Sequence, residues 1–323
     1  MTGMFDLHCD TILRLVEGGR LRGMEGGHLD IPRLRRGGSL AQCFAIFVPE
    51  RAYAPEAGPD GADRYVKRAY GAFLRELEAN QEDIRQARSL AEIEENRRAG
   101  RLSAVLTIED AVSLDGKLER LDQYAGMGVK MVSLLWNNEN SLGYPTSPDA
   151  ARHALGLKPF GLEAVERMEE LGIAVDVSHL SEGGFWDVVR VGKKPFAASH
   201  SCARALQDHP RNLTDRQLRA IADRGGVVGV NFCAEFLHSK SGDGKDLTTA
   251  EDIARHLLHM KNVAGVDILA LGSDFDGIDN RLAFGDFGGM EALARALGQW
   301  FSEEELEAIC WKNAWRTFGE IWG

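Results

Sequence analysis

The 323-residue sequence has few cysteines, and no two of them are spaced as a metal-binding pair. The five are Cys9, Cys43, Cys202, Cys233 and Cys310, with no Cys-x-x-Cys among them. Cysteine-ligated metal sites use close pairs, and disulfide frameworks use even numbers. Neither is indicated, and we expect most of the cysteines to be small buried apolar residues in a reducing cytoplasm.

Long apolar runs are also absent. No stretch approaches the roughly 18 apolar residues that a membrane-spanning helix needs. The start, Met1–Asp6, lacks the basic residues and apolar core of a signal peptide. We therefore expect a cytoplasmic protein without a membrane partner.

Positive charge is the minority charge: 38 Lys and Arg stand against 49 Asp and Glu, for a formal net charge of -11. Nucleic acids and anionic membranes are bound through clustered Lys and Arg, so this balance argues against both partners. The 44% hydrophobic and 27% charged residues are typical of a globular protein. We expect one catalytic domain over residues 1–323.

What the sequence does contain is a regular alternation of short apolar runs with longer amphipathic stretches. Runs such as Val227–Val230 are apolar without interruption, as in parallel strands that are covered on both faces. Eight such runs predict a closed (β/α)8 barrel, an α/β fold, over its rival, a doubly wound sheet. The predicted strands are Met4–Cys9, Leu40–Val48, Ala104–Ile108, Lys130–Leu135, Ile173–Ser178, Phe196–Ser199, Val227–Phe232 and Ile268–Ser273.

Helical patterns separate these strands, and the segment Thr214–Gln217 has the form of a capping box at a helix start. An insertion after the second strand, Glu50–Leu102, has helical patterns of its own. The Gly- and Pro-rich segment Asn137–Pro159 is predicted to be a loop over the barrel mouth, and Gly289–Trp322 to form extra helices. The other predicted helices are Ala62–Ala79, Ser89–Arg98, Leu118–Ala125, Gly161–Leu171, Glu182–Val191, Thr214–Asp223 and Thr249–Val263.

Histidines and carboxylates follow several of the predicted strands. The carboxyl ends of barrel strands converge on one face, so these side chains are expected to share a pocket. In His8-Cys9-Asp10 the histidine and the aspartate leave the same face of the strand and can bind one cation together. His179 and His200 can bind a second cation, and Glu109 lies between the two groups and can bridge them. Imidazole with carboxylate favours zinc.

Each of these residues also has a plainer interpretation. Asp10 is placed to cap a helix beginning at Thr11, Glu109 to begin a loop, and a single buried histidine is usually a hydrogen-bonded core residue. Five metal-type residues at the same ends of separate strands favour the metal site. The histidines in loops or helices are assigned structural roles, namely His153, His209, His238, His256 and His259.

These motifs together resemble the renal or membrane dipeptidase family, peptidase family M19, from residue 5 to about residue 320. The resemblance implies a (β/α)8 barrel with two zinc ions that hydrolyses dipeptides, including some with a C-terminal D-residue. The residues that carry it are Asp6–Thr11, His28–Leu34, Ile108–Glu109, Asp176–His179, Ser199–Ser201, Arg211–Asn212 and Gly272–Gly277.

Residue by residue, the resemblance implies that His8 and Asp10 bind one zinc ion and that His179 and His200 bind the other. It implies that Glu109 bridges the two ions and is also a catalytic residue.

The same resemblance implies that Arg211 receives the substrate carboxylate, a role suited to its bidentate fork. It also implies that Asp274 is catalytic and moves a proton near the substrate amine. Without the resemblance, Arg211 would equally fit a surface salt bridge or a contact at the helix start near Thr214.

Two positions depart from the kidney-type pattern. Trp136 stands where those enzymes have a carbonyl-polarising histidine, and Phe236 where they have a carboxylate-binding tyrosine. Asn137 or Asn138 is a candidate substitute for the histidine, since indole cannot become a cation. Trp136, Asn137 and Phe236 are therefore predicted to contact substrate, and their identity bears on which dipeptide is cut.

Two alternative functions are open at this stage. One is another metal-dependent amidohydrolase, acting on a lactone, a cyclic amide or an N-acyl amino acid. The other is a non-catalytic barrel that binds a ligand in the same pocket. Four tryptophans near the C-terminus are predicted to pack in the core, because they have helical spacing, or else to form the seam of a homodimer. They are Trp300, Trp311, Trp315 and Trp322.

Overall fold

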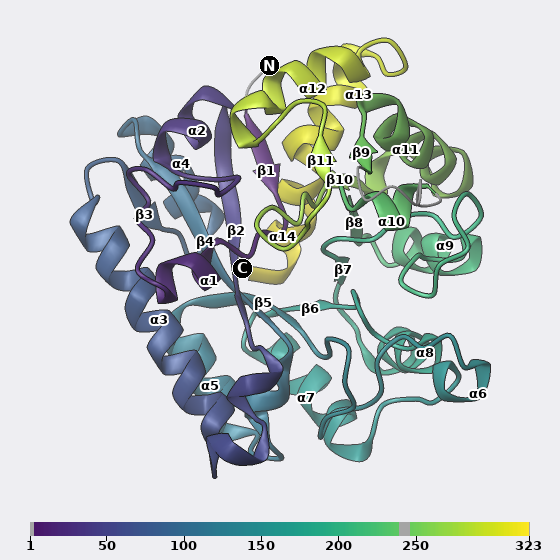
Figure 1. The fold of residues 1–323 in the computed structure, drawn as a ribbon. Coiled ribbons are helices and arrows are strands. Elements are labelled where there is room, and N and C mark those ends of the chain that lie inside the picture. The colour runs from purple at the N-terminus through teal and green to yellow at the C-terminus, as the bar shows by residue number, and fades with distance from the viewer. Residues whose placement is uncertain (1–2, 239–245, 323) are drawn as a thin grey trace.

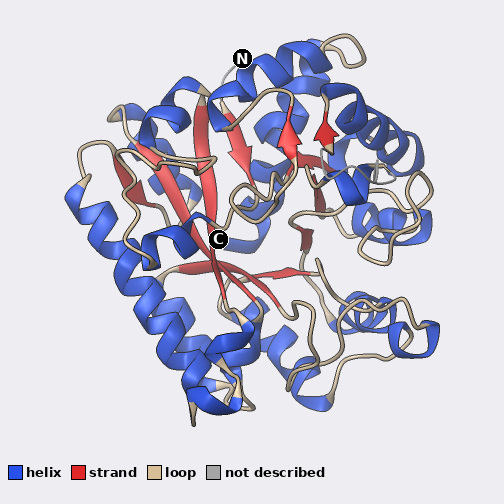
Figure 2. Cartoon of the chain, in the orientation of Figure 1, coloured by secondary structure: helices blue, strands red, loops and turns tan. Residues whose placement is uncertain are grey.

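The computed structural model describes residues 3–238 and 246–322. Parallel strands run around a closed barrel, with helices on its outside (Figure 1, Figure 2). Neighbours in the barrel follow the order β2-β1-β10-β8-β7-β6-β5-β4, and β4 pairs with β2 to close it. The barrel strands are β1 (Met4–Asp6), β2 (Ser39–Phe47), β4 (Leu102–Glu109), β5 (Val129–Ser133), β6 (Ala174–Asp176), β7 (Ala197–Ala198), β8 (Val227–Val230) and β10 (Leu269–Leu271).

The eight predicted strands and the barrel fold are confirmed. Several strands are shorter than the sequence predicts, and β7 has only two residues where Phe196–Ser199 was expected. The apolar runs continue into turns that leave the sheet but stay buried, so hydrophobicity alone overestimates strand length.

Some strands were not predicted. A further strand, β3 (Ile84–Gln86), pairs with the start of β4 outside the barrel, and only Ile84 in it is fully buried. Two-residue strands β9 (Leu247–Thr248) and β11 (Arg281–Leu282) pair with each other. Segments this short contain no periodic pattern to detect.

Helices cover the outside of the barrel, and those predicted between the strands and in the insertion are confirmed (Figure 1). Thr214 caps its helix through the predicted capping box with Gln217. The predicted loop Asn137–Pro159 contains one short helix. The helices are α1 (Thr11–Val16), α2 (Ile31–Arg36), α3 (Gly61–Ala79), α4 (Leu90–Arg98), α5 (Glu119–Met127), α6 (Ala150–His153), α7 (Pro159–Glu170), α8 (Glu182–Val191), α9 (Asp215–Asp223), α10 (Ala234–Leu237), α11 (Ala250–Ala264), α12 (Met290–Leu297), α13 (Glu303–Glu307) and α14 (Asn313–Trp322).

The C-terminal helix α14 packs against the beginnings of the barrel strands. Trp322 stacks on Phe318 with ring centroids 4.5 Å apart and donates a hydrogen bond to the Lys130 carbonyl. Phe318 in turn lies 5.6 Å from Phe5 of β1. Trp322 thus serves core packing, and a homodimer stays a prediction. Within the described part of the chain, no helix has the length and apolarity needed to cross a membrane.

Two glycines allow β8, β10 and the end of β7 to approach one another closely. A Cβ atom on either Gly229 or Gly272 would overlap the carbonyl oxygen of Ser199. This contact fixes the backbone directly before His200. The two glycines therefore set the position of a residue at the barrel mouth.

Gly272→Ala is expected to lower the free energy of unfolding by about 1–3 kcal/mol, because overpacking forces backbone shifts. Gly126→Ala is the matched control, since Gly126 is exposed in α5 and a Cβ there meets nothing within 4 Å. That control should stabilise the protein slightly, by about 0.5–1 kcal/mol. Urea denaturation followed by circular dichroism measures both, and equal stabilities for the two variants would contradict the packing argument.

Candidate metal centre

The five side chains predicted to bind metal lie together at the carboxyl ends of the barrel strands. His8 and Asp10 follow β1, Glu109 ends β4, His179 follows β6 and His200 follows β7. All five are buried, with at most 7% of any residue exposed. The barrel thus brings together residues separated by up to 192 positions in the chain.

Glu109 lies at the centre of the group. Its Oε2 is 3.4 Å from Nε2 of His8, while its Oε1 is 3.0 Å from Nε2 of His179 and 3.5 Å from Nε2 of His200. The two carboxylate oxygens therefore face different histidines. Nε2 of His179 and Nε2 of His200 are themselves 3.0 Å apart.

His8 also faces two aspartates. Its Nε2 is 3.7 Å from Oδ2 of Asp10 and 3.9 Å from Oδ1 of Asp274. Nε2 of His8 and Oδ1 of Asp10 are buried without a hydrogen-bond partner. Such orphaned polar atoms are rare in native proteins and call for an explanation. A cation bound between them would satisfy both, so the residues present fit a metal.

Burial shapes the protonation of the group. It lowers the pKa of His179 to about 4 and that of His200 to about 3, which favours the neutral imidazole that binds metal. Burial, with the nearby charge of Glu109, raises the pKa of Asp10 to about 8, and burial raises that of Asp274 to about 6. Ionised carboxylates that lie this close together repel one another, and bound cations would relieve the repulsion.

The turns after the strands have an unusual backbone. His179 and Asp274 have φ angles of 68° and 62°, in the left-handed region that non-glycine residues seldom adopt. Asp10 occupies the N-cap position of α1, the structural role that its place before Thr11 also allowed. Its side chain nevertheless makes no capping hydrogen bond. The backbone at these positions directs side chains towards the cluster instead of towards local partners.

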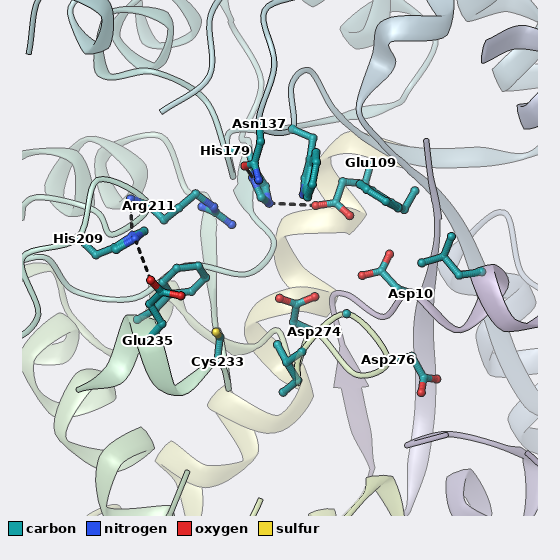
Figure 3. Close-up of a pocket in the computed structure, with 16 residues that line it drawn as sticks. Asp10, Glu109, Asn137, His179, His209, Arg211, Cys233, Glu235, Asp274 and Asp276 are labelled. Carbon is teal, nitrogen blue, oxygen red and sulfur yellow. Dashed lines mark hydrogen bonds and ion pairs between the residues drawn. The ribbon is translucent and has the colours of Figure 1, made fainter. Parts of the chain in front are cut away.

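A cavity of about 420 Å³ opens next to the cluster (Figure 3). Asp10, Glu109, His179 and Asp274 form part of its wall. The four residues predicted to contact substrate line it as well, namely Trp136, Asn137, Arg211 and Phe236.

Arg211 is buried, with 6% of the residue exposed, so a surface salt bridge does not describe it. Its guanidinium lies 5.4 Å from the ring centroid of Phe236, and one nitrogen donates to the His200 carbonyl at 3.3 Å. Its Nε has no hydrogen-bond partner. Burial lowers the pKa of Arg211, which still remains a cation at neutral pH. A buried cation that lines a cavity suits an anionic ligand.

The three residues Trp136, Asn137 and Asn138, which follow β5, differ in what they contact. Trp136 packs edge-on against Phe47, with ring centroids 4.8 Å apart, and forms an apolar wall. Asn137 Oδ1 lies 3.3 Å from Nδ1 of His179, so this amide contacts a candidate ligand. Asn138 instead donates to Tyr53 and to Glu50 in the insertion, and does not line the cavity.

His209, for which a structural role was predicted, lines the cavity as well. Its Nδ1 accepts a hydrogen bond from the Arg211 backbone, and its ring lies 4.8 Å from that of Phe236. Glu235 lies beside it (Figure 3). The signal for His209 in the sequence is its position two residues before the Arg211–Asn212 motif. His256, by contrast, is a core residue that accepts from the Ala203 backbone.

Three buried aspartates near the cluster were not predicted as site residues. Asp6 and Asp176 accept hydrogen bonds from Ser273 and Ser199 respectively. Asp276 accepts from Thr11 and from Arg14, and so ties the turn after β10 to α1. In the sequence, Asp6 and Asp176 lie two and three residues before the candidate ligands His8 and His179, and Asp276 lies two residues after Asp274.

The family model for membrane dipeptidase (peptidase family M19) matches residues 1–322. The chain belongs to this family. Its members are metallopeptidases, so this chain is a hydrolase of that class and its cluster is expected to hold metal. The family's barrel is the fold described above.

Solved M19 structures are similar over the whole chain. A dipeptidase described as a metallopeptidase of family M19 is 30% identical with a TM-score of 0.89, and each chain is covered completely. A metallopeptidase of Rhodobacter sphaeroides, liganded with a phosphinate mimic of the dipeptide L-Ala-D-Ala, is 30% identical with a TM-score of 0.88, over 99% of each chain. Among sequence relatives, an uncharacterised dipeptidase of Schizosaccharomyces pombe is 32% identical, over 78% of this chain and 61% of its own.

Glu109→Gln is expected to weaken metal binding by on the order of 100-fold or more, since even residues outside the ligand shell change affinity 10- to 100-fold. Glu235→Gln is the control, because this carboxylate lines the same cavity away from the cluster. Metal content after dialysis, measured by mass spectrometry, should fall for the first variant alone. Full metal content in Glu109→Gln would contradict the assigned cluster.

Proposed function

We propose that this protein is a zinc dipeptidase with two metal ions per chain, cleaving dipeptides that include those with a C-terminal D-residue. The observation that carries the proposal is the position of Glu109, whose two oxygens face separate groups of metal-type side chains. A carboxylate in this position suits a bridge between two cations.

One cation would be held by His8 and Asp10, the other by His179 and His200, with Glu109 shared between them. Imidazole and carboxylate donors without cysteine suit zinc. When bound, the two ions would supply Lewis acidity at the scissile carbonyl and an activated water. The chain's own residues then orient the substrate and move protons.

Asp274 is the proposed proton carrier. Its Oδ2 accepts a hydrogen bond from Asn231 at 3.0 Å, which leaves Oδ1 directed towards His8 and the cluster. Burial raises its pKa to about 6, close to the pH at which a carboxylate can both take and release a proton efficiently. Asp274 Oδ1 takes the proton from the attacking water and delivers it to the leaving amine.

Arg211 is proposed to fix the carboxylate of the substrate. Its side chain lines the cavity, where a guanidinium can donate to an anion through its planar fork of N–H groups. Holding the far end of the dipeptide aligns the amide with the cluster, which turns binding energy into alignment. Trp136 and Phe236 then form apolar walls around the substrate side chains.

The inclusion of dipeptides with a C-terminal D-residue is supported by similarity to the Rhodobacter sphaeroides metallopeptidase. That protein binds a mimic of L-Ala-D-Ala and shares the fold of this chain over 99% of both. Assays with L-Ala-D-Ala, L-Ala-L-Ala and N-acyl amino acids test directly which of these substrates are cleaved. Faster turnover of an N-acyl amino acid than of either dipeptide would overturn the dipeptidase proposal.

Asp274→Asn is expected to abolish dipeptide turnover while leaving the metal content unchanged, because the amide cannot carry the proton. Asp279→Asn, an exposed residue of the same turn, is the control and should retain activity. Parallel activity assays and metal analysis separate the outcomes. Loss of metal together with activity in Asp274→Asn would instead make Asp274 a ligand.

Arg211→Gln is expected to lower kcat/KM for a dipeptide with a free carboxylate by about 30-fold or more, the effect of removing one partner of a buried charge pair. The same dipeptide with a C-terminal carboxamide should lose much less. Arg204→Gln, which removes an arginine paired with Asp208, is the control. Equal losses on acid and carboxamide would mean that Arg211 does not recognise the carboxylate.

A further inference from the structure

A continuous chain of hydrogen bonds connects a buried carboxylate to one candidate metal ligand. Asp176 ends β6 and is completely buried. Its Oδ2 accepts from Oγ of Ser199 at 2.5 Å, and the same Oγ lies 2.7 Å from Nδ1 of His200. Ser199 thus stands between the carboxylate and the imidazole.

The donors around Asp176 determine the direction of these bonds. Its carboxylate also accepts from Oγ of Ser133 and from the backbone amides of Ser178 and Ser199. A carboxylate surrounded by donors is held in its ionised form, which only accepts. The single hydroxyl proton of Ser199 must therefore point to Asp176, and its oxygen is left to accept from His200.

This direction places a proton on Nδ1 of His200 and leaves the lone pair on Nε2. That Nε2 faces Oε1 of Glu109 at 3.5 Å and Nε2 of His179 at 3.0 Å. It is the nitrogen that would bind a cation. Metal-binding histidines commonly donate their other nitrogen to a carboxylate or carbonyl, which fixes the tautomer and raises the basicity of the ligand.

We propose that Asp176, acting through Ser199, is a positioning residue that fixes the Nδ1-protonated tautomer of His200 and so strengthens metal binding. The claim that metal binding is strengthened rests on the proposed function. The claim about the tautomer of His200 does not. Nothing in the relay requires Asp176 to touch substrate.

Two other side-chain contacts near the cluster resemble this relay but lack one of its parts. Ser273 likewise donates to a buried aspartate, Asp6 at 2.6 Å, but its other contact is the backbone carbonyl of His8 at 3.1 Å. His179 has Asn137, an uncharged loop amide, at 3.3 Å from its Nδ1. The relay on His200 links an imidazole ring to a carboxylate through one hydroxyl.

Ser199→Ala removes that hydroxyl and leaves Asp176 with its remaining donors. Ser133→Ala is the matched control, because it removes a hydroxyl from the same carboxylate oxygen without contacting His200. The first measurement is the tautomer of His200 in the metal-free protein, from ¹⁵N-labelled imidazole spectra assigned with His200→Gln. The second is zinc affinity by competition with a chelator.

In the unchanged protein and in Ser133→Ala, His200 should be protonated at Nδ1. In Ser199→Ala this signature should be lost, and zinc affinity should fall about 10- to 100-fold. Ser133→Ala should stay within about threefold of the unchanged protein, below the loss expected when the relay is broken.

An unchanged tautomer in Ser199→Ala would overturn the proposal, as would an equal loss of zinc affinity in both serine variants. Failure of the proposed function has a different signature. The tautomer would respond to Ser199→Ala as expected, yet the unchanged, zinc-loaded protein would cleave no dipeptide.

Discussion

The buried carboxylate of Glu109, surrounded by three imidazoles, is the interaction on which the arrangement of this protein depends. Removing a carboxylate from water is unfavourable unless hydrogen bonds or opposite charge compensate for it. Glu109 can meet His8, His179 and His200 only if β4 is held beside β2 and β5 in a closed barrel. Beside Glu109, Nε2 of His8 and Oδ1 of Asp10 are buried without hydrogen-bond partners, and a bound cation would satisfy both. We therefore expect fold and metal binding to be coupled.

That coupling explains features of the barrel that would otherwise be unfavourable. The left-handed backbone at His179 and Asp274 is strained for non-glycine residues. Close contact of Gly229 and Gly272 with the Ser199 carbonyl leaves no room for side chains. Each feature directs a strand end towards the cavity, so strain is concentrated where the chemistry takes place while the surrounding strands remain regular.

The barrel and its cluster were predictable because their signals are local. Uninterrupted apolar runs predict strands, and the two-residue spacing of His8 and Asp10 puts both side chains on one face. The cavity wall was less accessible to sequence reasoning. Asn137 contacts the candidate ligand His179 only because two loops meet at the mouth of the barrel. His209 accepts a hydrogen bond from the backbone of Arg211 two residues later, but its place on the cavity wall depends on where the fold positions that loop. The strand β3 was missed because three residues carry no period.

Anomalous diffraction from crystals of the zinc-loaded protein, collected above and below the zinc absorption edge, tests the central claim most directly. The account predicts two peaks about 3.5–4 Å apart on either side of the Glu109 carboxylate. One should lie beside His8 and Asp10, the other beside His179 and His200. A single peak, or peaks away from Glu109, would contradict it.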